Sequence, residues 1–306
     1  MGIGNRMDGA DTARPPSKPD KASAYTLSAP KYAMSDLILA AETLQQIEQA
    51  MAFRHHQRLV FEQWGLQQTH RHSRRVCLNF YGPPGTGKTM AAHAVAHALG
   101  KRLLIVNYAE IESKFVGETP KNLVAVFKQA EEEDAVIFFD EADALLSKRV
   151  TNMSNATDTS VNQTRSVLLN ILNDYDKTIL FATNFIENFD PAFMRRILAH
   201  VHFILPDESC RRRLYNMYIP SAMPHAVDVG EIARSHAGLS GSDIANAVLM
   251  AAFSAAQRGG SKVLHADMEG AVLNILAGKR ANAGKVSVTT REVSEAYVQQ
   301  AMGEQA

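Results

Sequence analysis

The chain has 306 residues, 46% of them hydrophobic, and its 32 lysines and arginines balance its 32 aspartates and glutamates. A formal net charge of zero argues against nucleic-acid binding over the whole surface, and two distant cysteines argue against a disulfide framework. The sequence has no run of about 18 apolar residues and no secretory signal at its amino terminus. We therefore expect a cytoplasmic protein without a membrane partner.

The first part of the chain divides into a polar tail and a helical stretch. Proline, aspartate, lysine and serine dominate the first residues, so little apolar surface is available for burial. We assign residues 1–35 to a disordered tail. Apolar residues at helical spacing then cover residues 36–65 and stop at Gly65, which predicts one helix or two.

Short apolar runs alternate with helical stretches in the middle of the chain. The runs cover residues 76–81, 103–108, 135–140, 178–183 and 201–205. Continuously apolar strands separated by helices predict an α/β fold, with a parallel five-stranded sheet covered on both faces. After Pro206 the pattern is helical. We therefore expect an α/β domain over residues 36–206, which includes the amino-terminal helix, and a small all-helical domain over residues 207–306.

The segment GPPGTGKT lies between the first apolar run and a helix-forming run. Its glycines let backbone N–H groups approach a phosphate chain, and the following helix adds the positive end of its dipole. Lys88 is placed to reach the outer phosphates, and the Thr89 hydroxyl is a ligand for magnesium. The alternative is a glycine-rich turn with an incidental lysine, but the flanking strand and helix favour phosphate binding. The predicted nucleotide-binding residues are Gly82, Pro83, Pro84, Gly85, Thr86, Gly87, Lys88, Thr89 and Met90.

The apolar run VIFF is followed directly by Asp140 and Glu141. An acid at the carboxyl end of a buried parallel strand lies beside the phosphate loop in such sheets. Asp140 is therefore predicted to bind nucleotide-associated magnesium, and Glu141 to act as a general base on the attacking water. The alternative is a helix start with acidic residues in its first turn, which does not explain why the acids end so apolar a strand.

GPPGTGKT and FFDEAD together resemble the motifs of the AAA+ ATPases, a family of ring-forming P-loop enzymes, over roughly residues 36–300. The resemblance implies a P-loop AAA+ large domain, a helical lid domain, and ATP and Mg²⁺ as cofactors. Asn184, in the segment ATN, resembles the residue that orients the attacking water. Arg195 and Arg196, in DPAFMRRI, resemble arginine fingers that act on a neighbouring subunit's ATP. Their alternatives are a strand-end turn and a pair of surface arginines, and the choice between the two arginines stays open.

Two further segments resemble functional parts of the family. In GLSGSDIANAV, Gly241 and Ser242 are similar to residues beside the adenine and ribose, and Asp243 caps or orients a helix. Lys114, Phe115, Val116 and Gly117 resemble a pore loop that grips an extended substrate chain through its aromatic ring. The alternative is a loop with a partly buried phenylalanine. Residues 151–160 are expected to form a second loop on the same channel.

The resemblance implies an ATP-hydrolysing motor that threads a protein substrate through a homo-hexameric pore. We expect the substrate or adaptor to be a protein, for example a HORMA-domain protein opened by a bacterial pachytene-checkpoint-type remodeller in antiphage signalling. Similarity to katanin- and spastin-like disassembly ATPases is a second possibility, and a Rubisco-activase-like remodeller is a third. From another class, a nucleotide-gated helicase- or clamp-loader-like protein is the alternative, which the pore aromatic and the zero net charge disfavour.

Overall fold

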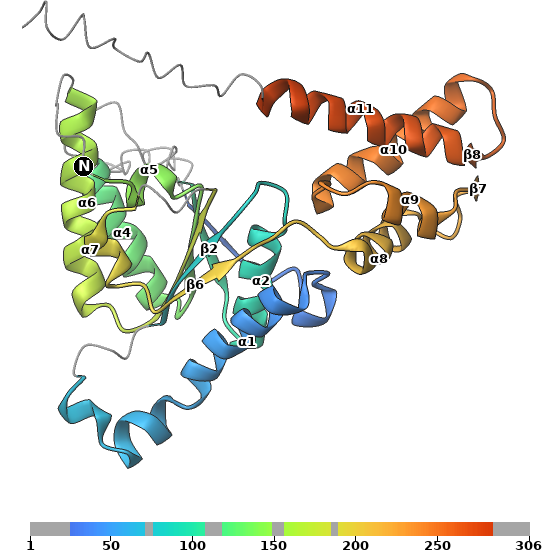
Figure 1. Cartoon of the computed structure of the whole chain (residues 1–306). Helices are drawn as coiled ribbons and strands as arrows, with labels where there is room; N and C mark the ends of the chain where they lie inside the picture. The colour runs from blue at the N-terminus through green and yellow to red at the C-terminus, as the bar shows by residue number, and fades with distance from the viewer. Residues whose placement is uncertain (1–24, 71–75, 108–117, 149–155, 185–188, 284–306) are drawn as a thin grey trace, which may run out of the picture.

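The computed structural model describes residues 25–70, 76–107, 118–148, 156–184 and 189–283 (Figure 1). In this part of the chain, six strands form the main sheet in the order β1-β3-β4-β5-β2-β6. Strand β1 is antiparallel to β3, and the other neighbouring pairs are parallel. The predicted α/β fold with a mostly parallel sheet is therefore confirmed. The strands are β1 (Tyr25–Ser28), β2 (Val76–Tyr81), β3 (Leu103–Asn107), β4 (Val136–Asp140), β5 (Thr178–Thr183) and β6 (Ala199–His202).

The edge strands differ from the sequence expectation. Strand β1 and a short 3-10 helix, η1 (Met34–Asp36), lie in or at the end of the segment assigned to the disordered tail, and β1 adds a sixth strand. Strand β1 is stabilised by pairing with β3 and by packing of Leu27 on the core. Both are contacts with distant segments, so the composition of the tail does not predict them. Strand β6 ends at His202, because its ladder with β2 ends where Tyr81 pairs with His202.

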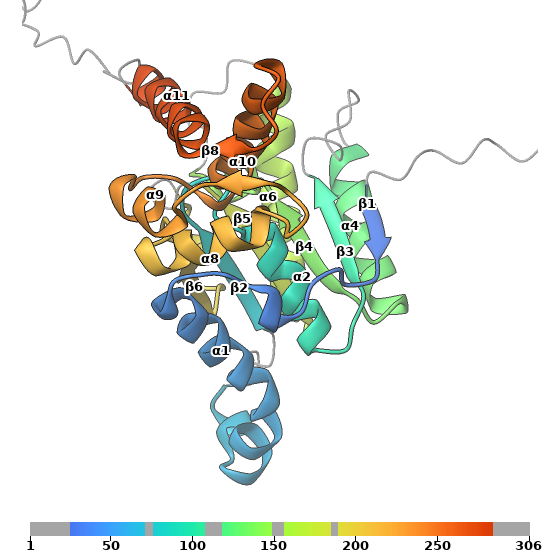
Figure 2. The same ribbon diagram turned by 90° about the vertical axis from the view of Figure 1, so that its right-hand side faces the viewer.

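Helices cover both faces of the sheet, giving three layers (Figures 1 and 2). On one face, Ile47 of α1 and Val95 of α2 pack against strand residues such as Leu78 and Phe80. On the other face, helices α4 to α7 enclose a second core. Each central strand is therefore covered by helices on both sides, and this burial explains why the strand sequences are apolar runs. The helices are α1 (Ala41–His55), α2 (Lys88–Ala98), α4 (Glu118–Glu132), α5 (Asp143–Leu146), α6 (Ala156–Asp174) and α7 (Pro191–Met194), with η2 (Leu59–Gln63) and η3 (Leu66–Gln68) after α1.

The carboxyl-terminal part is mainly helical and has a core of its own. Buried residues of this core extend from Leu214 to Val272. A short parallel pair of strands, β7 and β8, joins the helices, so the described residues here are not all helical as expected. None of the described helices combines the length and hydropathy that a membrane span requires. The elements are α8 (Glu208–Tyr218), β7 (His225–Ala226), α9 (Val229–Ser235), α10 (Gly241–Gln257), β8 (Val263–Leu264) and α11 (His265–Ala283).

Candidate functional site

The glycine-rich loop connects the carboxyl end of β2 to the first turn of α2. Gly82, Gly85 and Gly87 have φ angles of +140°, +74° and +98°, a region that favours glycine. A Cβ atom on Gly82 would lie 2.0 Å from the carbonyl oxygen of Phe203, so this position also excludes a side chain for lack of space. The glycine spacing of the motif therefore has a direct conformational cause.

Lys88 is buried at the start of α2, and its ammonium group is held inside the loop. Its Nζ atom donates to the carbonyl oxygens of Gly82 at 2.7 Å and Pro83 at 3.1 Å, and to Oδ1 of Asn184 at 3.0 Å. Burial lowers the pKa of Lys88, while the charges of Asp140 and Asp143 oppose that fall. The loop thus holds a cation beside exposed backbone, as phosphate binding requires.

The predicted magnesium ligands lie together. The Thr89 hydroxyl donates to Oδ2 of Asp140 at 2.9 Å, which places a hydroxyl and a carboxylate oxygen in direct contact. Hard oxygen donors of this kind fit Mg²⁺. Glu141 is exposed and has a φ angle of +51°, which is uncommon for a residue other than glycine. Its backbone N–H donates to Oδ1 of Asp140 at 3.0 Å, so this turn is tied to the carboxylate that the sequence predicts to bind magnesium.

Asn184 lies between the loop and the acids because of the strand order. Strand β5 lies between β2 and β4 in the sheet. Where the carboxyl ends of these parallel strands meet, the end of β5 therefore lies between Gly82 and Asp140. Asn184 is the first residue after β5, and its side chain accepts the bond from Lys88. The structure therefore brings together Lys88, Thr89, Asp140 and Asn184, as the sequence predicts.

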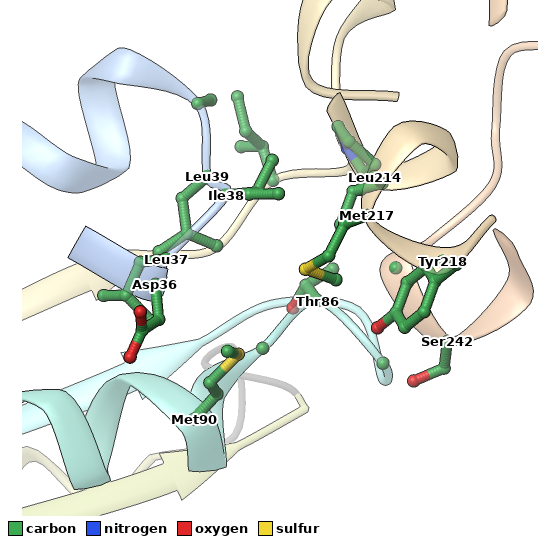
Figure 3. A pocket seen from close by; sticks show the side chains of 16 residues that line it. Asp36, Leu37, Ile38, Leu39, Thr86, Met90, Leu214, Met217, Tyr218 and Ser242 are labelled. Atoms are coloured by element: carbon green, nitrogen blue, oxygen red, sulfur yellow. The ribbon is translucent and has the colours of Figure 1, made fainter. Parts of the chain in front are cut away.

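A cavity beside the loop is lined by segments that are distant in sequence (Figure 3). Residues 36–40, before α1, form one wall, and Leu214, Met217 and Tyr218 of α8 form another. Thr86 and Met90 come from the loop and α2, and Gly241 and Ser242 from the start of α10. This largely apolar space next to a phosphate loop suits the flat ring of a nucleobase.

Helix α10 contacts the loop directly. The Ser242 N–H donates to the carbonyl oxygen of Gly85 at 3.2 Å, and a Cβ atom on Gly85 would lie 2.7 Å from Oγ of Ser240. Ser240 and Asp243 form a capping box at the helix start, as expected for Asp243. Gly241 and Ser242 therefore lie beside the loop, and their contact with adenine and ribose stays a prediction.

Sequence reasoning missed most of this cavity wall. Residues 37–40 and the α8 side chains are apolar and belong to no motif, so only their tertiary position links them to the site. Asp143 is a different case. Its carboxylate accepts the Asn184 N–H. Because Asp143 stands in the same DEAD segment as Asp140 and Glu141, its sequence position already indicated that it lies near the site.

Arg195 and Arg196 directly follow α7, which lies on the face of the sheet opposite α2, together with α6 (Figure 1). Arg195 is exposed, and its Nε donates to the carbonyl oxygen of Pro191 at 3.3 Å. Arg196 is half-buried, and its Nε donates to Oδ1 of Asn173 at 3.0 Å. The structure does not bring either arginine to the glycine loop of its own chain.

Two predicted segments lie wholly or partly outside the described residues. The pore-loop residues Lys114, Phe115, Val116 and Gly117 lie outside the described residues. The same holds for residues 151–155 of the second predicted loop, whereas residues 156–160, expected in that loop, are the first residues of α6. Their proposed roles stay predictions from the sequence.

The fold and the loop define a class of protein. A glycine loop between a parallel strand and a helix, with an acid ending a neighbouring strand, is the arrangement of a P-loop nucleotide-binding domain. Residues 78–205 match the profile of the family described as "ATPase family associated with various cellular activities (AAA)". This part of the chain is therefore an AAA ATPase domain.

Curated relatives extend the similarity beyond that domain. The chain is 35% identical to the 26S proteasome regulatory subunit 4 homolog of Oryza sativa subsp. japonica, over 65% of this chain and 46% of that protein. It is 31% identical to the probable 26S proteasome regulatory subunit 4 of Caenorhabditis elegans, over 83% and 58%. It is 33% identical to the proteasome-activating nucleotidase of Methanococcus vannielii, over 69% and 53%. The chain thus spans about half the length of the curated relatives it matches.

Proposed function

We propose that the protein is an ATP-hydrolysing motor that remodels or unfolds protein substrates. The observation that carries this proposal is the convergence of Lys88, Thr89, Asp140 and Asn184 at one edge of the sheet, within an AAA ATPase domain. Lys88 and the loop amides would bind the phosphates, and Thr89 and Asp140 would hold Mg²⁺. The ion would supply charge neutralisation of the phosphates.

Water activation and nucleobase binding are assigned to neighbouring residues. Glu141 would accept a proton from the attacking water, which Asn184 would orient. The cavity between residues 36–40 and α8 would hold the base, with Gly241 and Ser242 closing it from α10. This assignment supports a large domain over residues 36–206 and a lid over residues 207–306, because the second part has its own core and contributes one wall of the cavity.

We further propose that the chain acts as a homo-hexamer, with Arg195 reaching the ATP of a neighbouring subunit. Arg195 is exposed, whereas Arg196 is engaged with Asn173 on α6. An exposed guanidinium is suited to stabilise charge across a subunit boundary. Arg196 then serves to hold α7 against α6, so that Arg195 projects from a fixed position.

The central test separates nucleotide chemistry from substrate handling. Phe115→Ala is expected to keep basal ATP hydrolysis and to lose unfolding of a tagged fluorescent protein, because the ring grips the chain but does not touch ATP. Lys88→Ala is expected to lose both activities. Phosphate release that rises strongly with single-stranded DNA, together with unimpaired Phe115→Ala protein, would instead favour a nucleic-acid loader.

The substrate is addressed by a trap variant. Glu141→Gln should bind ATP without hydrolysing it and retain substrate, and captured proteins can be identified by mass spectrometry against a Lys88→Ala control. A HORMA-domain protein would support the antiphage remodeller hypothesis, and cytoskeletal or membrane-scaffold proteins would support katanin-like disassembly. Because three relatives are named for the proteasome, a captured proteolytic partner is a further outcome of interest.

A further inference from the structure

Asp143 holds the backbone of Asn184 in place. Its Oδ1 and Oδ2 atoms accept the Asn184 N–H at 3.0 and 3.2 Å. Strand β5 ends at Thr183, so Asn184 has left the ladder and its N–H needs another acceptor. A half-buried carboxylate provides a charge-assisted bond, which is stronger than one between neutral groups.

A second bond joins the same two segments. The Ala142 N–H donates to the carbonyl oxygen of Ala182 at 2.8 Å. Ala142 directly precedes Asp143, and Ala182 stands two residues before Asn184. The turn after β4 is therefore connected to the end of β5 at two points. Because Glu141 lies in that turn, these bonds fix the general base and the water-orienting amide relative to each other.

Asp143 also lies within electrostatic reach of Lys88. Its charge opposes the fall that burial causes in the pKa of Lys88. Asp143 could therefore act in two ways. Its carboxylate could hold the Asn184 N–H, or its charge could stabilise the charged form of Lys88. The bifurcated hydrogen bond from the Asn184 N–H and the position of Asn184 just beyond the strand favour the first role.

We propose that Asp143 is a positioning residue for hydrolysis, which orients the Asn184 side chain by binding its backbone N–H. This inference rests on the proposed ATPase function. Asp140 and Glu141 are assigned to the metal and the water, so Asp143 adds a third role to the same segment. Misplacement of an orienting group by about 1 Å can lower a rate about 100-fold, so loss of this contact should affect turnover more than binding.

Asp143→Ala is expected to lower kcat about 10- to 100-fold, with the KM for ATP changed by less than about threefold. Asp143→Asn keeps an oxygen that accepts the Asn184 N–H and should restore most of the rate. Asp228→Ala is the matched control, because Asp228 caps α9 through the Glu231 N–H at 2.9 Å and lies outside the assigned site. It should lower thermal stability and leave kcat unchanged.

A double-mutant cycle with Asn184→Ala completes the test. If Asp143 acts through Asn184, Asp143→Ala should cost little further rate in the Asn184→Ala background. Additive losses would overturn the proposal, as would an Asp143→Asn variant as slow as Asp143→Ala. Lower melting temperature with unchanged kcat would reduce Asp143 to a structural role and also overturn it. Wild-type protein without phosphate release would instead refute the proposed function itself.

Discussion

The Nζ atom of Lys88 lies 3.0 Å from Oδ1 of Asn184, so the predicted phosphate-binding lysine and the predicted water-orienting amide share a hydrogen bond. Lysine has three N–H donors, and the other two bind carbonyl oxygens of Gly82 and Pro83. A phosphate oxygen that binds Lys88 must therefore compete with one of these acceptors. If the phosphate replaces Oδ1 of Asn184 as an acceptor for Lys88, nucleotide binding would free the Asn184 side chain to bind the attacking water.

This competition predicts the behaviour of Asn184→Ala. The variant should bind ATP at least as tightly as wild type, because one competitor for Lys88 is removed, while kcat falls at least about tenfold. Equilibrium binding of a fluorescent ATP analogue and steady-state phosphate release measure the two effects. Weaker binding by Asn184→Ala, similar to that of Lys88→Ala, would contradict the exchange.

The two arginines are expected to differ. Arg195→Ala should lower turnover at least about 100-fold with normal thermal stability, since an arginine finger contributes about 10³ to 10⁵ in rate. Arg196→Ala should also lower stability, because it loses the Asn173 and Ala192 contacts. Asn173→Ala is the matched variant and should reproduce part of the Arg196→Ala defect. Mixing Arg195→Ala with Lys88→Ala protein should partly restore activity, and no recovery would argue against action between subunits.

Glycine at position 82 is predicted to be required for two reasons, its φ angle and its close contact. Gly82→Ala should destabilise the fold by at least about 2 kcal/mol more than Gly100→Ala, because its Cβ atom would collide with the Phe203 carbonyl oxygen. Gly100 has a φ angle of +65° and no atom within 4 Å of the position that a Cβ would take, so its substitution costs only about 1 kcal/mol of backbone strain. Urea denaturation measures both variants, and equal losses would contradict the steric argument.

The contact between α11 and the start of α10 predicts an acid-dependent loss of stability. Burial raises the pKa of Asp243, but hydrogen bonds from Lys279 at 2.6 Å and from Ser240 outweigh it, and the net pKa lies below the usual 3.8. A lowered carboxyl pKa stabilises the folded state above the unfolded value, and this contribution is lost as pH falls through the folded value.

Lys279→Gln should therefore be less stable than wild type at neutral pH, and the difference should shrink below pH 3.8. Arg280→Gln, at the next and exposed position of α11, is the control and should match wild type. Urea denaturation across pH at low ionic strength measures the effect, because salt screens a partly exposed pair. A difference that is constant with pH would exclude the Asp243 carboxylate as its source.

Several features were predictable because local chemistry determines them. Gly82, Gly85 and Gly87 need φ angles that favour glycine, and a lysine at the start of the next helix faces the loop they form. The apolar runs that end at Tyr81, Asp140 and Thr183 became strands with the same last residues, since burial on both faces favours apolar side chains along most of each strand. Motif and strand pattern thus indicated the phosphate loop and its acids.

Other features depended on contacts between distant segments. Strand β1 exists through its pairing with β3, and the cavity wall of residues 36–40 and α8 carries no motif. The proposed division of roles between Arg195 and Arg196 depends on the position of Asn173 on α6.

The sequence by itself determined that this chain has a P-loop followed by a strand that ends in an acidic residue. Both features depend on backbone conformation and burial over a few neighbouring residues. The tertiary structure alone decided which side chains meet. The insertion of β5 between β2 and β4 brings Asn184 to Lys88 and Asp143. Strand order results from long-range packing, which residue spacing along the chain does not encode.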